Sequence, residues 1–291
     1  MKKSISLLTL ALCFSIFGSY TANAQQLIPH RADVNQPVIA TFKAPTVVLL
    51  PSVKNLYAKT LNMSIYHTFG LVNTGVKQFW GLDGGTNIRL GLDYGITNDL
   101  SVGLGRTSLN KNVDARFKYS ILHQMTENGS PVDLAVTGDL GVITEPQAFQ
   151  GSYTFGDKLG YSLMFMAARK FSDNLSLQVS PVVGHFNKVF SGEKNTYFGV
   201  GFSGRYKLTG HTALAIEYLP VFNKTNSMTN ELSVAVNIET GGHVFQLFFS
   251  NSQSFDPQDI LRRTNNQAFK GFRFGFNINR IFWFKGAKRG K

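Results

Sequence analysis

The residues in this sequence that are best able to do chemistry are charged side chains that alternate with apolar ones. Between Thr86 and Arg106, for example, Arg89 and Asp93 interrupt a regular series of leucine, isoleucine and tyrosine. The same alternation along the chain selects five basic and four acidic residues, so their charges nearly cancel. They are Arg89, Asp93, Arg116, Lys118, Asp133, Asp139, Arg205, Glu217 and Arg273.

Two interpretations of these charges remain open. If they line a water-filled barrel, they form a polar pore with a weak preference for anions, because strong selectivity requires a ring of one sign. If they are shielded from water, they form ion pairs that fill the barrel and hold it closed, because buried charges need partners.

The histidines and serines do not form a recognisable reactive site. No two histidines have the His-x-His or His-x-x-x-His spacing of metal ligands, so we expect no metal and no cofactor. Ser203 lies in "GFSGR", which misses the Gly-x-Ser-x-Gly nucleophile motif by one position and lies within an alternating segment. We therefore expect Ser203 to be a small lumen-facing residue and the protein not to be an enzyme.

The amino terminus has the features of a secretory signal peptide. Lys2 and Lys3 precede a short apolar run, and Ala22-Asn23-Ala24 is a small-x-small cleavage site. We expect residues 1–24 to be removed near Ala24. The only cysteine, Cys13, lies in this segment, so the exported chain has no disulfide.

Composition narrows the class of protein. The formal net charge of +12 is dispersed and not gathered in a stripe, so we expect no nucleic-acid partner. Mean hydropathy is −0.05, far below that of a helical membrane protein. Alternating apolar and polar residues in a membrane barrel average to about this value.

Period-two alternation predicts twelve strands in one all-β domain. Two of them form a hairpin within residues 86–106. The others are expected at 56–71, 114–123, 132–142, 159–170, 174–184, 196–207, 212–219, 231–238, 242–250 and 270–280.

The connections between these strands alternate in length. Those after even-numbered strands are short and rich in turn residues, and those after odd-numbered strands are mostly longer. This is typical of a transmembrane antiparallel β-barrel with short periplasmic turns and longer outer loops. Ile88, Leu90 and Leu92 would then face lipid. Arginine at a lumen-facing position such as Gly201 is expected to cost much less than arginine at Leu90 or Leu134.

Two flanking segments complete the domain organisation. Residues 25–55, with prolines at 29, 37, 45 and 51, are expected to form an extended periplasmic lead-in to a barrel at 56–284, and a short plug is the alternative. Residues 285–291 form a basic tail. In the longest loop, Asp256 and Pro257 are a cap and first residue for a short helix. That helix would either constrict the mouth or cover the surface.

The stretch from Phe69 to Gln124 also resembles an uncharacterised β-barrel family of Gram-negative bacteria, domain of unknown function 5777. The matching motifs are "HTFG" at 67–70, "GLD" at 81–83, "YGIT" at 94–97, "GRTS" at 105–108 and "GGHVFQLFFSNSQ" at 241–253. Thr68 stands where the family would have arginine. The resemblance implies a barrel at the outer membrane, and it implies no substrate and no catalytic residues.

These observations predict a barrel in the outer membrane of a Gram-negative bacterium, surrounded by lipid and inserted by the barrel-assembly machinery. We expect it to act as a passive channel or a structural membrane component. The alternative is a closed barrel that binds ligands or docks partners through its loops. Its partners would be small solutes or periplasmic proteins. A soluble β-rich secreted protein is a third interpretation.

Overall fold

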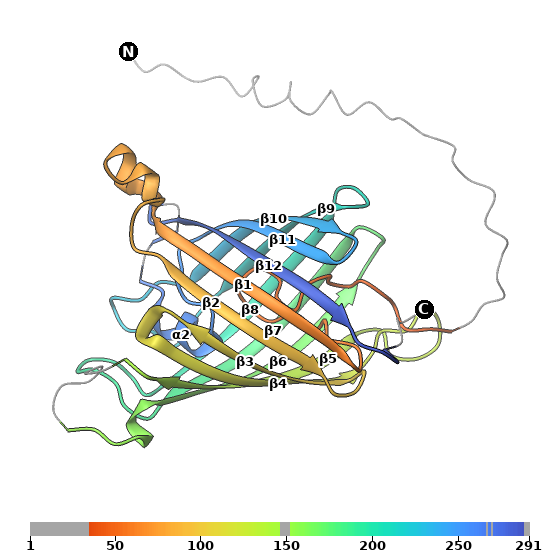
Figure 1. Cartoon of the computed structure of the whole chain (residues 1–291), viewed down its shortest axis with the longest axis horizontal. Coiled ribbons are helices and arrows are strands. Elements are labelled where there is room, and N and C mark those ends of the chain that lie inside the picture. The colour runs from red at the N-terminus through yellow and green to blue at the C-terminus, as the bar shows by residue number, and fades with distance from the viewer. Residues whose placement is uncertain (1–34, 146–151, 266, 269, 288–291) are drawn as a thin grey trace, which may run out of the picture. The chain divides into compact units, whose positions relative to one another are not determined.

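The structure, a computed structural model, describes residues 35–145, 152–265, 267–268 and 270–287. The predicted signal peptide at 1–24 and the last residues of the basic tail lie outside this part. Twelve antiparallel strands form a closed barrel in which each strand pairs with its sequence neighbours and β1 pairs with β12 (Figure 1). The predicted twelve-stranded barrel is therefore confirmed.

The strands are β1 Thr60–Leu71, β2 Asn87–Gly95, β3 Leu100–Thr107, β4 Asn112–Leu122, β5 Asp133–Ile143, β6 Leu159–Lys170, β7 Leu175–Phe186, β8 Thr196–Lys207, β9 Thr212–Leu219, β10 Glu231–Thr240, β11 His243–Ser250 and β12 Arg273–Trp283. The helical segments are η1 Val72–Gly81, η2 Leu109–Lys111, η3 Gly156–Lys158 and α2 Pro257–Arg263. No helix in the described residues is long and apolar enough to cross a bilayer.

Alternation places the apolar side chains outside the barrel. In β2, Asn87 and Arg89 are fully buried, whereas Leu90 and Leu92 are 54% and 52% exposed. Leu104 in β3 is 65% exposed. A continuous apolar exterior of this kind is what lipid requires and what a soluble protein avoids.

Aromatic rings gather on the outside at both ends of the seam between β1 and β12. Toward the long loops, His67 stacks on Phe276 with 5.0 Å between ring centroids, and Phe69 lies 5.8 Å from Phe274. Toward the short turns, Tyr57 stacks on Trp283. Aromatic rings at two levels are typical of the two membrane–water interfaces.

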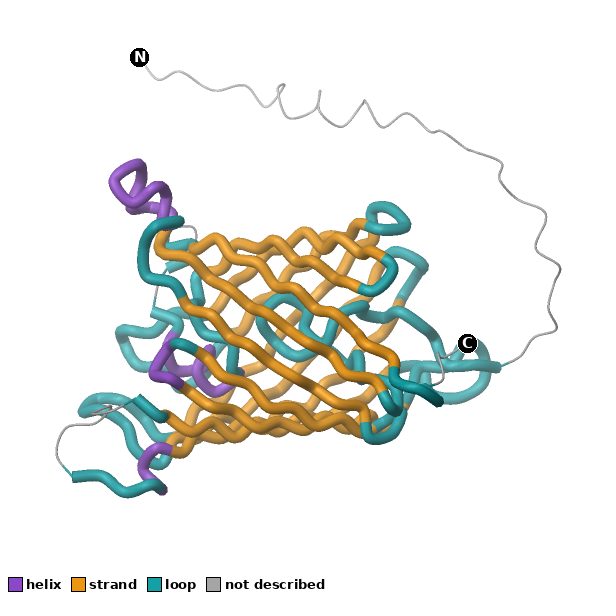
Figure 2. Tube along the Cα trace, in the orientation of Figure 1, coloured by secondary structure: helices purple, strands orange, loops and turns teal. Residues whose placement is uncertain are grey.

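The connections follow the expected alternation with two exceptions. The connections at 96–99, 171–174, 208–211 and 241–242 are short, and those at 72–86, 144–158, 187–195, 220–230 and 251–272 are longer (Figure 2). Residues 108–111 make a shorter link than expected, and 123–132 a longer one. We call the two ends of the barrel the short-turn end and the long-loop end.

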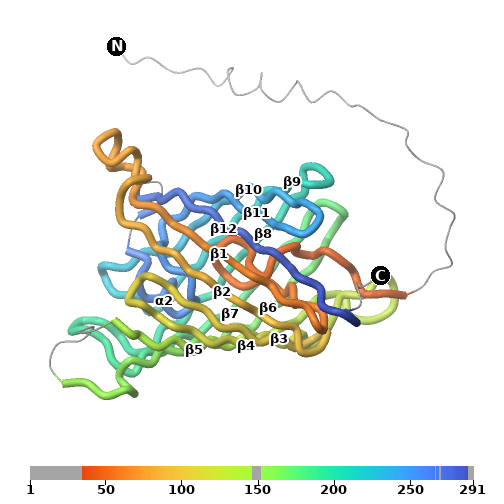
Figure 3. Tube along the Cα trace, in the orientation of Figure 1, coloured from red at the N-terminus to blue at the C-terminus, as the bar shows by residue number. Residues whose placement is uncertain are grey.

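Two segments of the chain occupy the interior. Residues 41–56, here called the lumenal plug, enter before β1 and turn back within the barrel (Figure 3). Residues 251–264 lie in the connection between β11 and β12 and fold into the lumen. We call this segment, which includes α2, the loop strap. A barrel of twelve strands is wider than side chains alone can fill, and these segments occupy the remaining space.

The plug changes the expectation for residues 25–55. Residues 41–55 do not remain a lead-in outside the barrel, because Val47, Val48, Leu49 and Leu50 are each at most 2% exposed inside it. Burial of these four apolar side chains favours an interior position.

Candidate functional site: the occupied lumen

Glu217 of β9 holds the centre of the plug. Its carboxylate accepts the backbone N–H groups of Val48, Leu49 and Leu50 at 3.2, 3.1 and 3.0 Å. Glu217 is fully buried. Successive N–H groups that point to one centre form a nest for an anion, and here the anion is a wall side chain.

Other polar wall residues bind the plug backbone on both sides of this nest. Gln178 accepts from the N–H of Val53 and donates to Pro51 O, both at 2.9 Å. Gln246 donates to Val47 O at 2.7 Å, and Asn277 to Val48 O at 2.8 Å. An irregular segment away from water needs such partners for its backbone groups.

Lys118 of β4 binds the plug backbone at three points. Its ammonium donates to Pro45 O at 3.0 Å, Ser52 O at 2.8 Å and Lys54 O at 3.0 Å. All three donor positions of the ammonium are therefore used. Lys118 closes a loop of the plug and does not present its charge to open solvent.

One side of the lumen is apolar and receives the plug's side chains. Met164 and Met166 of β6 are buried, and they belong to one cluster with Val47–Leu50. The outward residues of β6, Leu163 and Phe165, are also apolar. Some strands are therefore apolar on both faces, an arrangement that simple alternation does not predict.

The space in front of Gly201 is occupied. A Cβ placed on Gly201 would lie 2.8 Å from Leu50 Cδ1, closer than carbon atoms approach in folded proteins. The plug therefore fills the lumen at this point, and a larger side chain at Gly201 requires the end of the Leu50 side chain to shift. That arginine costs less at Gly201 than at Leu90 or Leu134 stays a prediction.

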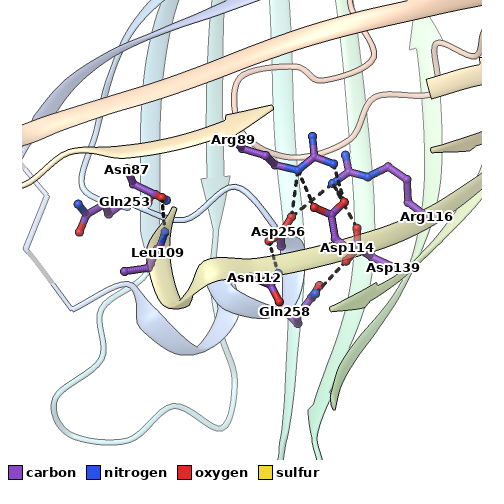
Figure 4. Close-up of polar contacts among 10 residues, drawn as sticks. All are labelled: Asn87, Arg89, Leu109, Asn112, Asp114, Arg116, Asp139, Gln253, Asp256 and Gln258. Carbon is purple, nitrogen blue, oxygen red and sulfur yellow. Dashed lines mark hydrogen bonds and ion pairs between the residues drawn. The ribbon is translucent and has the colours of Figure 1, made fainter. Parts of the chain in front are cut away.

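A buried charge cluster joins the barrel wall to the loop strap (Figure 4). Arg89 of β2 donates through Nε to Asp114 at 3.0 Å and lies 3.5 Å from Asp256 of the strap. Arg116 of β4 contacts Asp114 at 2.9 Å, and Asp139 and Asp256 at 3.3 Å each. Two guanidinium groups thus face three carboxylates, and one of these carboxylates belongs to the loop strap.

Further contacts seat the strap. Asn112 donates to Asp256 at 3.0 Å and Gln258 to Asp139 at 2.8 Å. The Cδ atoms of Leu261 lie near Gly184 and Gly199, where an added Cβ would come within 3.1 and 2.9 Å. The helix starts at Pro257 as expected, but the Asp256 side chain makes no cap hydrogen bond. Its carboxylate contacts the wall instead.

The surroundings of Asp256 disfavour its charged form. Burial raises the pKa of this carboxyl well above its ordinary value, and the neighbouring Asp114 and Asp139 raise it further. Arg89 and Arg116 act in the opposite direction. Carboxylate oxygens of Asp114, Asp139 and Asp256 lie within 4.8 Å of one another, a spacing that could hold a cation. The two arginines already supply positive charge to these groups.

The charges chosen from the sequence point into the barrel, but they do not form a ring. Asp93 accepts from Asn62 at 3.3 Å, and Arg205 pairs with Glu239. Asp133 accepts from Thr41 at the plug entrance at 2.7 Å, and Arg273 donates to Phe69 O at the long-loop end. Each group has a local structural contact.

Several lumenal residues were missed, namely Asp114, Gln178, Gln246, Asp256 and Asn277. Asp114 lies two positions before Arg116, so its side of the strand could have been read from the alternation. Uncharged amides carry no comparable signal in the sequence.

Two hollows remain beside the plug. A cavity of about 40 Å³ lies among the plug, Pro257 of the strap and β1–β5, and its walls include Asp93 and Arg116. A larger hollow of about 370 Å³ lies at the short-turn end, lined by residues 37–42, Tyr57 and His123 among others. Lys54 and Asn55 line both hollows. The central cavity has room only for a few water molecules.

Comparison with solved structures gives similarities at low sequence identity. The KdgM porin has a TM-score of 0.48 and 10% identity over 77% of this chain and 99% of that one. An outer membrane channel from Pseudomonas putida F1 has a TM-score of 0.45 and 15% identity, over 79% and 97%. An active-site mutant of outer membrane phospholipase A from Escherichia coli has 0.43 and 12%, over 78% and 91%. No curated protein matches significantly.

A family model matches most of the sequence. It is described as a membrane bound beta barrel domain and covers residues 42–282. The match starts among the residues that form the plug here and ends in β12. The chain belongs to the membrane-bound β-barrel family DUF5777.

Proposed function

We propose that this protein is a gated channel of the bacterial outer membrane, closed in this structure by the lumenal plug. The observation that carries the proposal is that a segment preceding β1 occupies the lumen and is held there by hydrogen bonds to polar wall side chains. The short turns would face the periplasm and the long loops the exterior.

The chemistry of the wall supports a removable plug. Glu217, Gln178 and Gln246 would be hydrated if the plug left, so their lost contacts would be replaced by water. Exchange of this kind makes the net value of each neutral hydrogen bond modest, about 0.5–1.5 kcal/mol. The solutes would be small and polar.

A catalytic role has less support. Ser203 Oγ is buried and has no hydrogen-bond partner, so it lacks the adjacent base that activates a serine nucleophile. The charged lumenal groups named above are engaged with one another, with the plug or with neighbouring wall residues. We therefore propose transport and not chemistry.

Single-channel conductance in a planar bilayer tests the proposal. The exported chain from Gln25 should be silent or open only briefly, and a variant that lacks residues 25–56 should conduct steadily. The pair L50C/G201C supplies a matched control, because Leu50 contacts Gly201 and the only native cysteine, Cys13, precedes the exported chain. Oxidation of the two cysteines should abolish the openings of the L50C/G201C variant. Reduction should restore the brief openings expected of the native chain.

The second candidate is a closed barrel that docks a periplasmic ligand or partner. The hollow of about 370 Å³ at the short-turn end favours it, because residues 37–42 of the chain form part of its lining. A folded plug-deletion variant that remains silent would reject the channel and support this alternative.

A further inference from the structure

The loop between β1 and β2 presents large apolar side chains to its surroundings. Val76 is 75% exposed, Phe79 57%, Trp80 48% and Leu82 38%. Unlike the loop strap, η1 extends away from the barrel beyond the end of β1, at the upper left of Figure 1. These side chains therefore take no part in filling the lumen.

The base of this loop is held firmly to the barrel. The N–H of Val72 donates to Phe272 O at 2.9 Å, and Asn73 donates to Lys270 O at 2.7 Å. Gly81 packs so closely on Gly70 that a Cβ would lie 2.5 Å from the Gly70 carbonyl. The loop that carries the exposed side chains is thus fixed to the barrel at its base.

The backbone at the tip has an uncommon conformation. Phe79 and Trp80 have φ values of 43° and 52°, in the left-handed region that bulky residues rarely adopt. Their rings lie 5.8 Å apart. Backbone conformations of this kind concentrate at sites that contact ligands, and here the backbone presents two adjacent aromatic rings outward.

Lipid is the occupant that the surroundings favour. The loop begins at Val72, three residues after the outward-facing Phe69, which belongs to the aromatic group on β1, β11 and β12. The apolar exterior of the barrel therefore continues into the loop. Lys77 is exposed beside Phe79 and Trp80. Aromatic rings accompanied by a lysine are the combination that settles at a membrane–water interface.

We propose that residues 76–82 form a membrane-surface anchor, with Phe79 and Trp80 inserted at the boundary between headgroups and acyl chains on the long-loop side. Lys77 would contact lipid phosphate. The anchor would fix the depth and rotation of the barrel at the seam where β1 meets β12. This inference does not depend on whether the lumen conducts.

The two tryptophans of the chain, Trp80 and Trp283, allow a direct test. The exported protein carrying W283F is reconstituted in phosphatidylcholine–phosphatidylglycerol vesicles, which leaves Trp80 as the only indole. We expect blue-shifted emission that is quenched more by lipids brominated near the carbonyl end of the chain than by lipids brominated near the methyl end. Aqueous acrylamide should quench it weakly.

Other results would overturn the proposal. Red-shifted emission quenched by acrylamide would place Trp80 in water, and blue-shifted emission insensitive to brominated lipid would place it against protein, such as a second copy of the chain. W80F is the matched control, because it reports Trp283 at the opposite end of the same seam. K77E in the W283F background should lessen the quenching of Trp80 by brominated lipid. Unchanged quenching would contradict the contact between Lys77 and lipid phosphate.

Discussion

At the residue scale, the lumenal groups act as anchors for chain segments that fill the barrel. Glu217, Lys118 and Gln178 contact backbone atoms of the plug, and Arg116 contacts a carboxylate of the strap. A charged lumen therefore need not mean an open conducting path. The interpretation of closing ion pairs describes the cluster around Arg116, whereas Lys118 and Glu217 bind backbone groups.

The substitution E217Q tests the nest beneath the plug. The amide keeps one acceptor oxygen but turns an NH₂ group toward backbone N–H donors, so plug binding should weaken by about 1–3 kcal/mol. The measurement is the open probability in a planar bilayer, which should rise. E145Q, in an exposed loop pair with Lys111, is the control and should leave it unchanged. If E217Q and E145Q changed the open probability equally, Glu217 would have no specific role in keeping the plug in the lumen.

The substitution G201V tests the contact between wall and plug. The added side chain overlaps Leu50, so overpacking should cost about 1–3 kcal/mol or displace the plug. Truncation of the opposing residue in the double variant G201V/L50A should recover much of the loss. Urea unfolding in vesicles measures both. No recovery in the double variant would mean that Leu50 does not occupy this space.

At the element scale, the strap illustrates how a short helix is held by contacts with the surrounding wall. The predicted start at Pro257 is confirmed, but seven residues are too few for a stable isolated helix. Its position comes from Leu261 against two wall glycines and from Asp256 in the charge cluster.

The raised pKa of Asp256 predicts how strap docking depends on pH. The docked state favours the protonated carboxyl, so docking is strongest below the ordinary aspartate pKa and weakens as pH rises toward the raised value. In the plug-deletion variant, the steady conductance should therefore increase from acid to neutral pH. The groups that face Asp256 are Arg89, Asn112, Asp114, Arg116 and Asp139.

The substitution D256N should abolish this response, because the amide does not titrate. D259N is the matched control on the same helix, where Asp259 pairs with Arg263. Conductance measured at a series of pH values distinguishes the two. A pH response that persists in D256N would assign it to another group.

The outward face of the strands should be sensitive to charged side chains. Leu90, near the middle of β2, points outward, and L90R should destabilise the folded barrel by about 2–4 kcal/mol if it faces the bilayer midplane. D173R, in an exposed turn, should have little effect. Urea unfolding in vesicles gives both values, and equal costs would contradict the assignment of a lipid-facing surface.

At the scale of the whole molecule, a closed barrel and its contents depend on each other. Closure pairs β1 with β12 and leaves no strand edge in lipid. The same closure produces an interior too wide for side chains, so chain segments enter it. One comes from before the first strand and the other from the last loop, and both lie beside residues distant in sequence.

The sequence by itself determined the twelve strands, the outward apolar face and most of the loop lengths, because strand alternation and turn chemistry are local properties. Leu90 faces outward for reasons contained within its own strand. Only the tertiary structure decided that Val48 would meet Glu217 and that Asp256 would meet Arg116, because strand tilt, register and barrel diameter set which distant residues share the lumen. Four apolar residues among prolines are compatible with an exposed lead-in or an interior plug, and only the width of the closed barrel distinguishes them.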